Sequence, residues 1–361
     1  MTERMLALGL MSGTSCDGVD AALVETDGID FVRCGAALSF DYPREFRQRL
    51  RAALGDAAAG EALAAELTDR HAEAVRALIA KTGIAAIDLA VVGFHGQTIL
   101  HEPEQHRTLQ IGDGARLARA VGIDVVNDFR AADMAAGGEG APLAPLFHRA
   151  LAIGLEKPLA VLNLGGVGNA TWIGEDRDGA MRLLAFDTGP GNALIDDWAM
   201  LHTGEPVDRD GRLAGVGQVD ASLLGRLLVH PYFARPAPKS LDRDAFDASI
   251  LAELAPADGA ATLVAFTAAT VARGAQLFPE PVKQWLVTGG GRQNPAIMAE
   301  LRRRLDRPVV PVKAVGWNGD QLEAQAFAYL AVRSLKGLPL SLPETTGVKR
   351  PTRGGRIHRR S

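Results

Sequence analysis

The chain has 361 residues, enough for two domains of ordinary size with a substantial core. Its 47% hydrophobic and 23% charged residues are typical of soluble globular proteins, and a net charge of -4 argues against a general nucleic-acid binder. Two cysteines cannot build a disulfide framework and suit a reducing compartment. The N-terminal apolar run ends too early for a signal peptide, and the apolar stretch 260–272 is too short to span a bilayer. We therefore expect a cytoplasmic protein without a nucleic-acid or membrane partner.

The first predicted element is a β-hairpin, because apolar runs at 5–10 and 19–24 flank a short turn rich in glycine and hydroxyl residues. Small residues at a hairpin tip let the backbone approach a ligand, and consecutive N–H groups form a concavity that favours anions. The tip is therefore a candidate phosphate site, although an ordinary glycine-rich turn fits the segment equally well. The candidate residues are Ser12, Gly13, Thr14, Ser15, Asp17, Gly18 and Asp20.

Strands and helices alternate through the rest of the first half. Apolar residues at helical spacing predict two helices, and apolar runs bounded by turn residues predict two strands. The expected elements are a strand at 31–40, helices at 46–54 and 61–81, and a buried strand at 87–96 that ends in a glycine turn.

Polar residues follow this buried strand and the next apolar run. His95, Gln97 and Thr98 offer neutral donors and acceptors of the kind that bind sugar hydroxyls. Arg130 carries a guanidinium that can fork onto a carboxylate or a phosphate. Taken singly, an arginine more often forms a structural salt bridge and a histidine is more often a core residue. Their position near the glycine turns favours a role in binding.

The second half of the chain repeats the first. Strands are predicted at 159–164, 170–173 and 181–186, helices at 193–201 and 220–228, and a buried strand leads from 282 into a triple glycine. A second glycine-rich hairpin turn at 165–169 corresponds to the first. The candidate ligand-binding residues of this half are Asn163, Gly165, Gly166, Gly168, Asn169, Gly289, Gly290 and Gly291.

Two copies of one β-β-β-α-β-α unit predict an α/β protein with two similar lobes and a ligand cleft between them; coincidence among common α/β patterns is the alternative. Alanine, glycine and glutamate replace the periodic apolar residues at 131–140, which places the lobe boundary there. We expect a first lobe at 1–135, a second at 136–335, and a tail at 336–361 that returns to the first lobe. The basic cluster at 349–360 is expected to be a solvated end.

The glycine turns together suggest a nucleotide site. The two hairpin tips would hold phosphates from opposite sides, and the triple glycine would lie against a base or ribose. The sequence has no Walker-type phosphate loop, and no dinucleotide fingerprint opens its first βα unit.

Asp187 is the candidate general base. It stands at the predicted end of a strand, before Gly189, Pro190 and Gly191. A carboxylate at such a rigid turn can be held within hydrogen-bond reach of a reacting group. The alternative is a helix-capping role, for which Asn192 competes.

A late helix is predicted around 318–327, with Asp320 in its first turn, where the helix dipole favours a carboxylate. Glu323 lies on this helix. Spacing alone leaves open whether it reaches the cleft or faces solvent.

With these motifs, the chain resembles the anhydro-N-acetylmuramic acid kinases. The resemblance runs in order from residue 9 to about residue 331, nearly the whole chain. It rests on the segments Gly9–Ser15, Asp17–Asp20, His95–Thr98, Gln110–Asp113, Asn127–Arg130, Phe186–Asn192, Pro238–Ser240 and Thr288–Gly291. Position 16 departs from the family pattern, which has a larger apolar residue where this chain has Cys16.

The resemblance implies the two-lobed fold shared by acetate and sugar kinases, chaperone ATPases and actin. It implies a reaction in which ATP and water convert 1,6-anhydro-N-acetylmuramic acid to its 6-phosphate, in bacterial cell-wall recycling. By motif, Asp187 would be the base and Arg130 would hold the lactyl carboxylate. Gln97, Thr98 and Glu323 would line the sugar site, and the glycine turns would face ATP.

Magnesium is expected on the ATP phosphates, mainly through water, with Asp17 or Asp187 nearby; its direct ligands are not assigned. A homodimer remains open. Two alternative functions also stay open. One is a simple sugar or carboxylate kinase in which Asp187 deprotonates a substrate hydroxyl. The other is an ATP-switched binding module like the chaperone ATPases, which would need an additional peptide-binding domain.

Overall fold

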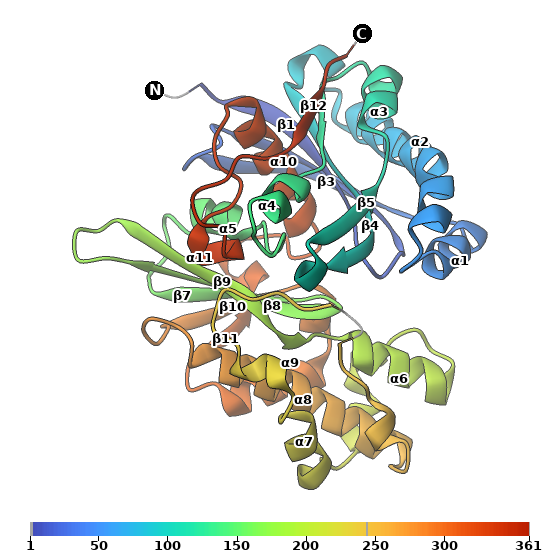
Figure 1. Cartoon of the computed structure of the whole chain (residues 1–361), viewed down its shortest axis with the longest axis vertical. Coiled ribbons are helices and arrows are strands. Elements are labelled where there is room, and N and C mark those ends of the chain that lie inside the picture. Colours follow the sequence, from blue (N-terminus) through green and yellow to red (C-terminus); the bar gives the residue numbers. More distant parts are fainter. Residues whose placement is uncertain (1–2, 243–244, 361) are drawn as a thin grey trace. The chain divides into compact units, whose positions relative to one another are not determined.

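The computed structural model describes residues 3–242 and 245–360. The chain divides into two compact units: the first comprises Met1–Gly154 and Gln321–Ser361, and the second Leu155–Asp320. Both are mixed α/β structures (Figure 1). In the part of the chain described, no helix is long and apolar enough to cross a membrane.

The first unit is built on one sheet, in the order β12–β6–β4–β1–β2–β3, with β5 paired to β4. Its strands are β1 (Met5–Ser12), β2 (Gly18–Thr26), β3 (Val32–Asp41), β4 (Val91–Glu102), β5 (Arg107–Ile111), β6 (Val125–Asn127) and β12 (Arg356–His358). Its helices are α1 (Arg44–Ala52), α2 (Ala57–Thr82), α3 (Gly114–Val121), α4 (Ala131–Ala135), α5 (Pro145–Leu151), α10 (Leu322–Leu335) and α11 (Pro343–Thr346), with short 3-10 turns η1 (Ala86–Asp88) and η2 (Pro103–Gln105).

The second unit is built on a sheet in the order β11–β10–β7–β8–β9. Its strands are β7 (Leu159–Leu164), β8 (Val167–Glu175), β9 (Met181–Pro190), β10 (Gln284–Thr288) and β11 (Val309–Pro311). Its helices are α6 (Ala193–Thr203), α7 (Ala221–Leu227), α8 (Pro256–Ala275) and α9 (Pro295–Arg304), with 3-10 turns η3 (Arg209–Gly211), η4 (Ala214–Val216), η5 (Pro231–Ala234), η6 (Ser249–Leu251), η7 (Gly290–Gln293) and η8 (Val312–Val315).

The predicted repeat is confirmed by strand order and direction. In each unit the first strand pairs antiparallel with the second, the second antiparallel with the third, and the first parallel with the fourth. A further parallel strand, β6 or β11, extends the sheet beyond the fourth. The carboxyl ends of the parallel strands in each unit therefore meet at one sheet edge, where α/β proteins bind ligands.

The unit boundaries differ from those predicted from the sequence. Residues 136–154 and 321–335 belong with the first unit, because α10 packs directly on its sheet. Gly9 of β1 and Gly93 of β4 make this contact possible: a Cβ on Gly9 would lie 1.8 Å from the Ala324 carbonyl oxygen, and one on Gly93 2.1 Å from that of Phe327. In turn, α5 packs on α10 through a ring contact of 5.6 Å between Phe147 and Tyr329.

The C-terminal segment is not the solvated end that its basic composition suggested. Residues 356–358 form β12, which pairs antiparallel with β6. His358 Nε2 lies 2.9 Å from Asn127 Oδ1, and Arg359 forms an ion pair with Asp124 at 2.6 Å. Main-chain pairing holds the segment in place, and its arginines project from that strand.

Candidate active site

The buried side-chain amide of Gln97 holds the first hairpin tip in place through hydrogen bonds to Ser12 and Gly13. Gln97 of β4 lies opposite Ser12 of β1 in the parallel register and is fully buried. Its Oε1 accepts a hydrogen bond from Ser12 Oγ at 2.6 Å, and its Nε2 donates to the carbonyls of Gly13 (3.1 Å) and Thr98 (3.2 Å). Tyr42 donates to Ser12 Oγ at 3.0 Å. Both ends of the Gln97 amide are thus used within the first unit, so we assign it to holding the tip.

The tip itself is a tight turn over residues 13–16. The Cys16 N–H donates to the Gly13 carbonyl at 3.0 Å, and Cys16 is buried with a φ of 53°. Asp17 is exposed, and its Oδ1 accepts from Ser15 Oγ at 2.8 Å. The smaller residue at position 16 therefore fills a buried corner of the turn while its neighbours point outwards.

Asp20 lies on β2 and contacts Gln321, the residue before α10, and Glu323 lies on α10 itself. Asp20 Oδ1 accepts from Ser39 Oγ at 2.5 Å and from Gln321 Nε2 at 3.3 Å. The predicted start of the late helix was wrong: α10 begins at Leu322, so Glu323 occupies its first turn and Asp320 precedes the helix. Glu323 is exposed.

In the second unit, the hairpin turn is shorter than predicted. It contains only Gly165 and Gly166, because β8 already begins at Val167; Gly168 and Asn169 are strand residues. The carbonyls of Gly165 and Gly166 accept hydrogen bonds of 2.8 Å from the N–H groups of Asn192 and Gly191, at the start of α6.

The triple glycine lies beside this second turn. Thr288 at the end of β10 pairs with Asn163 of β7, and Gly289 follows with a φ of 78°. A Cβ on Gly289 would lie 2.4 Å from Asn163 Oδ1 and 2.5 Å from the Leu164 carbonyl oxygen. The close backbone approach therefore requires glycine, and it brings two predicted nucleotide-binding segments together.

Asp187 lies within β9 rather than at its end, because the strand continues to Pro190. It pairs across the sheet with Asn169, so both side chains point to the same face. Its side chain is buried, with 6% of the residue exposed.

Three hydrogen bonds with η5 and the loop after it hold Asp187, and we call these three partners the frame of Asp187. The Leu241 N–H donates to Asp187 Oδ2 at 2.8 Å, the Asp187 N–H donates to the Lys239 carbonyl at 2.9 Å, and Tyr232 Oη donates to the Asp187 carbonyl at 2.5 Å. The sequence offered the segment 238–240 as a motif but gave no sign of this frame, because two of its three members are the main-chain groups of Lys239 and Leu241, which carry no residue signature.

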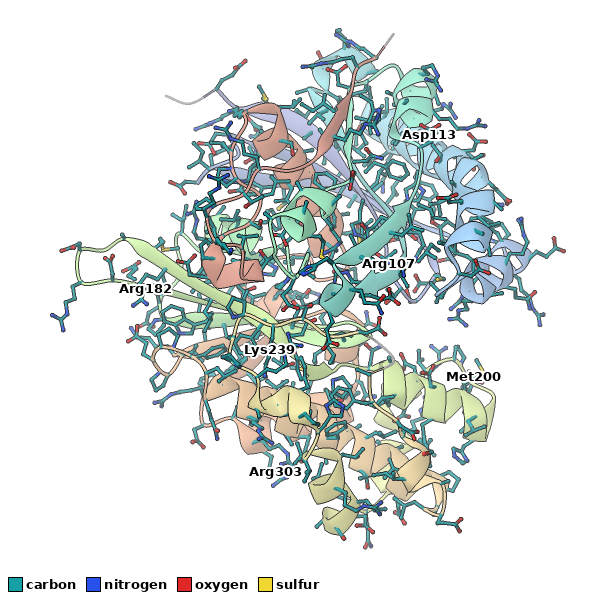
Figure 2. All side chains as sticks on the ribbon, in the orientation of Figure 1. Arg107, Asp113, Arg182, Met200, Lys239 and Arg303 are labelled. Carbon is teal, nitrogen blue, oxygen red and sulfur yellow. The ribbon has the colours of Figure 1, made fainter. Side chains whose placement is uncertain are left out.

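Lys239, labelled in Figure 2, links that loop back to η5 through hydrogen bonds of its ammonium group. It is buried, and its Nζ donates to the carbonyls of Tyr232 (3.1 Å) and Arg235 (3.0 Å). Burial, together with the nearby charges of Arg235 and Arg273, lowers the pKa of Lys239 to about 8, and the Asp187 charge acts in the opposite direction.

Arg130 directly precedes α4, and its side chain meets His95, which lies within β4. Arg130 Nε and Nη2 lie 3.2 and 3.1 Å from His95 Nε2, and Arg130 Nη1 donates to the Gly140 carbonyl at 2.7 Å. Thr98 lies further along β4 and accepts from Gln110 at 3.3 Å. The structure therefore brings together Arg130 and His95, as the sequence suggested.

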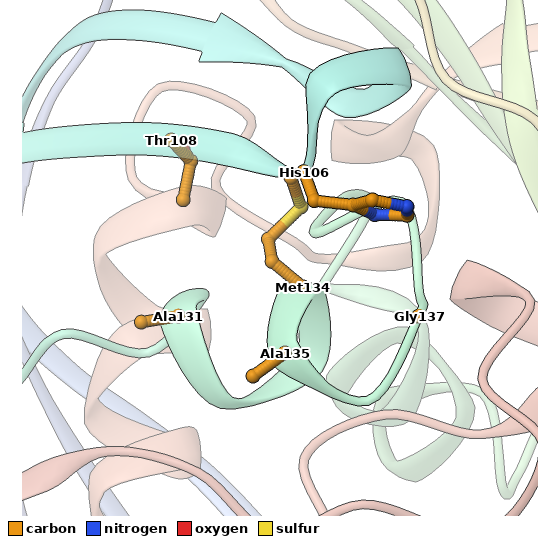
Figure 3. A pocket seen from close by; sticks show the side chains of 6 residues that line it. All are labelled: His106, Thr108, Ala131, Met134, Ala135 and Gly137. Carbon is orange, nitrogen blue, oxygen red and sulfur yellow. The ribbon is translucent and has the colours of Figure 1, made fainter.

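A pocket of about 370 Å³ opens within the first unit between α4 and β5 (Figure 3). Its lining was not foreseen from the sequence and comprises His106, Thr108, Ala131, Met134, Ala135 and Gly137. Ala131 directly follows Arg130, which is the N-cap residue of α4, so the pocket lies next to Arg130 in the chain.

The family model described as anhydro-N-acetylmuramic acid kinase matches residues 5–360. A protein with that name from Paramagnetospirillum magneticum is 59% identical, covering 98% of this chain and 99% of its own. One from Rhodospirillum rubrum is 58% identical, covering 97% of this chain and 93% of its own.

Two solved structures overlap with the chain more loosely. An activator of 2-hydroxyisocaproyl-CoA dehydratase from Clostridium difficile is 13% identical with a TM-score of 0.48, covering 92% of this chain and 96% of that one. A xylulose kinase from Lactobacillus acidophilus is 12% identical with a TM-score of 0.47, covering 99% and 94%.

Proposed function

Because this chain belongs to the anhydro-N-acetylmuramic acid kinase family, we propose how its own residues carry out that reaction. The protein is a phosphotransferase with an alcohol acceptor, and it uses ATP. The proposal concerns the roles of individual residues, the metal and the coupling of hydrolysis to phosphorylation. The observation that carries it is the buried Asp187, whose carboxylate accepts a hydrogen bond from the Leu241 N–H.

Asp187 is the proposed general base. A base must accept a proton from a position fixed to within hydrogen-bond distance. The frame of Tyr232, Lys239 and Leu241 fixes the backbone and one carboxylate oxygen of Asp187. That geometry supports a catalytic role over helix capping. Asn192 is the N-cap residue of α6, and its side chain donates to Asp196 instead of capping the helix.

The glycine tips are the proposed contacts for ATP. Several of their glycines are required by packing, since a Cβ on Gly18 would lie 2.2 Å from the Phe40 carbonyl oxygen. Gly13, Gly165 and Gly290 are different: a Cβ on any of them would meet nothing closer than 3.6 Å, and none has a positive φ. Protein packing therefore does not explain these three glycines. Close approach of a nucleotide does.

Arg130 is the proposed partner of the lactyl carboxylate, and Thr98 and Glu323 are proposed to contact the sugar. A guanidinium binds a carboxylate through a planar, two-pronged contact. Arg130 is half-buried at the start of α4 and tethered to β4. Glu323 is exposed in the first turn of α10 and can reach a ligand.

In the proposed reaction, a water oxygen bonds to the anomeric carbon while the bond from that carbon to the bridge oxygen breaks. Asp187 takes the proton that the water loses. The bridge oxygen bonds to the γ-phosphorus, and ADP leaves. The bridge oxygen is a poor leaving group by itself, so phosphoryl transfer and hydrolysis are coupled.

Magnesium would neutralise charge on the ATP phosphates. Among the described residues, no group of three or more His, Cys, Asp or Glu side chains is arranged to hold a metal ion. This fits magnesium, which in kinases is bound through substrate phosphates, water and one or two carboxylates. The exposed Asp17 at the first tip is the proposed carboxylate.

We place the enzyme in the cytoplasm, where ATP is present. Neither Cys16 nor Cys34 is part of a disulfide, which suits a reducing compartment.

The decisive test is a product assay in ¹⁸O-water with ATP, magnesium and 1,6-anhydro-N-acetylmuramic acid. We expect the label at the anomeric hydroxyl and none in the phosphate ester, read early against an unlabelled control because reducing sugars exchange that oxygen. N-acetylmuramic acid, which has no bridge to open, should be a poor acceptor. Equal rates on both sugars would favour a simple sugar kinase instead.

A further inference from the structure

We propose that His95 is a positioning residue that makes the enzyme selective for sugars carrying a carboxylate, by holding the Arg130 guanidinium in one orientation. This inference rests on the proposed role of Arg130 at the lactyl carboxylate.

The proton on His95 can be assigned from its two partners. His95 Nδ1 lies 2.8 Å from the Gly96 carbonyl oxygen, which can only accept, so Nδ1 carries the proton. Arginine nitrogens can only donate, so Nε2 is the acceptor for both Nε and Nη2 of Arg130. The histidine is thus a neutral ring with its lone pair aimed at the guanidinium.

The surroundings of His95 keep it neutral. It is only 4% exposed, and its ring packs 4.5 Å from the ring of Phe327 on α10. Burial and the Arg130 charge hold the pKa of His95 well below its usual range; a weaker effect of His71 acts in the same direction, and the Gly96 hydrogen bond opposes them. The acceptor therefore persists throughout the physiological pH range.

A second contact fixes the guanidinium from the other side. Arg130 Nη1 donates to the Gly140 carbonyl at 2.7 Å, and the Gly140 N–H donates to Asp133 Oδ1 at 2.7 Å. Asp133 is buried, and its Oδ2 accepts from Thr346 Oγ1 at 2.6 Å. A Cβ on Gly140 would lie 2.5 Å from Met134 Sδ, and Gly140 has a φ of 73°, so this position favours glycine.

These contacts set both the plane and the direction of the guanidinium. A free arginine side chain loses considerable rotamer freedom when it is immobilised by a ligand. Arg130 is already constrained by His95 and Gly140. Removing the His95 acceptor would keep the positive charge of Arg130 but let its guanidinium rotate. A two-pronged contact with a carboxylate depends on the orientation of the guanidinium plane.

The test compares two variants of the full-length chain. His95→Gln keeps an acceptor near the position of Nε2, whereas His95→Asn keeps a donor near Nδ1 and removes that acceptor. Both lose the ring contact with Phe327, and the two new side chains differ by one methylene group. Calorimetry would measure the dissociation constants for 1,6-anhydro-N-acetylmuramic acid, for 1,6-anhydro-N-acetylglucosamine, which lacks the lactyl group, and for ATP.

We expect His95→Asn to weaken binding of the muramic sugar about tenfold, the loss associated with one charge-assisted hydrogen bond, and to leave the other two ligands within about threefold. His95→Gln should restore most of the muramic affinity. Equal losses on both sugars, or no rescue by glutamine, would overturn the proposal and reduce His95 to a packing residue.

Asp133→Ala provides a second route if His95→Asn fails to fold. It removes the acceptor for the Gly140 N–H, so it loosens the Gly140 side of the guanidinium and should produce the same preference against the muramic sugar; a loss equal on both sugars would count against the proposal. Arg130→Ala separates the two hypotheses. If it does not discriminate between the sugars, the role of Arg130 itself is wrong. If it does and the His95 variants do not, only the positioning inference is wrong.

Discussion

Asp187 gives the sharpest test at the scale of single residues. Asp187→Asn keeps the size of the side chain and an oxygen for the Leu241 N–H, but it removes the capacity to take a proton. We expect turnover to fall by about 10²–10⁴, the usual contribution of general-base catalysis. Steady-state kinetics would measure the loss, and calorimetry should find ATP affinity nearly unchanged because the frame stays intact. Near-normal turnover would contradict the assignment.

Single residues also show what the sequence could not reveal about the site. Asp187 and Arg130 were visible because their residue types and flanking turns indicate chemistry. The frame around Asp187 was not, because it consists mainly of main-chain groups of residues about 50 positions away. The internal use of the Gln97 amide was hidden for the same reason: its partner Ser12 lies 85 positions earlier.

At the scale of elements, substitutions of different glycines distinguish a role in ligand contact from a role in packing. Gly13→Ala places a methyl group where nothing in the chain lies closer than Ser15 Oγ at 3.6 Å. We therefore expect an unchanged thermal midpoint and ATP affinity weakened about tenfold or more, since the methyl group would occupy space proposed for phosphate. Calorimetry and thermal denaturation measure the two effects. Unchanged ATP affinity in the folded variant would exclude the tip as a phosphate contact.

Gly93→Ala should have the opposite effect. The new Cβ would lie 2.1 Å from the Phe327 carbonyl oxygen, so α10 would have to move away from the sheet of the first unit. We expect the free energy of unfolding to fall by about 1–3 kcal/mol or more, the range for overpacking a core. Urea denaturation measures this change.

Gly225→Ala is the matched control for that measurement. Gly225 lies inside α7, and a Cβ there meets nothing within 4 Å. Alanine should stabilise this helix by about 0.5–1 kcal/mol because it restricts the unfolded chain more than glycine does. Destabilisation of both variants to the same degree would show that the contact with α10 is not the cause.

At the scale of the whole molecule, buried histidines should make the protein sensitive to acid. Burial lowers the pKa of His71 to about 4 and that of His148 to about 3, and both lie in the first unit. Between those values and the ordinary pKa near 6.5, the unfolded chain binds protons that the folded chain does not. Stability should therefore be complete above pH 6.5 and fall as the pH drops towards 4, by about 1.4 kcal/mol per pH unit for each histidine.

Urea denaturation at a series of pH values would test this dependence. His71→Leu removes one of the titrating groups, so it should flatten the slope between pH 4 and 6.5 by about one proton, whatever its effect on stability at neutral pH. An unchanged slope in the variant would show that His71 does not titrate as its burial implies.

The sequence by itself determined the repeated unit, the positions of most strands and helices, both glycine-rich hairpins and the candidate chemistry-bearing residues. These are local properties: hydrophobic periodicity, turn residues and short motifs record them directly. Only the tertiary structure decided that 136–154 and 321–335 belong with the first unit, that the basic C-terminal segment pairs as β12, and which groups form hydrogen bonds with Asp187 and Arg130. The physical reason is that these features depend on contacts between residues far apart in the chain. Such contacts are formed largely by backbone groups, which every residue carries alike.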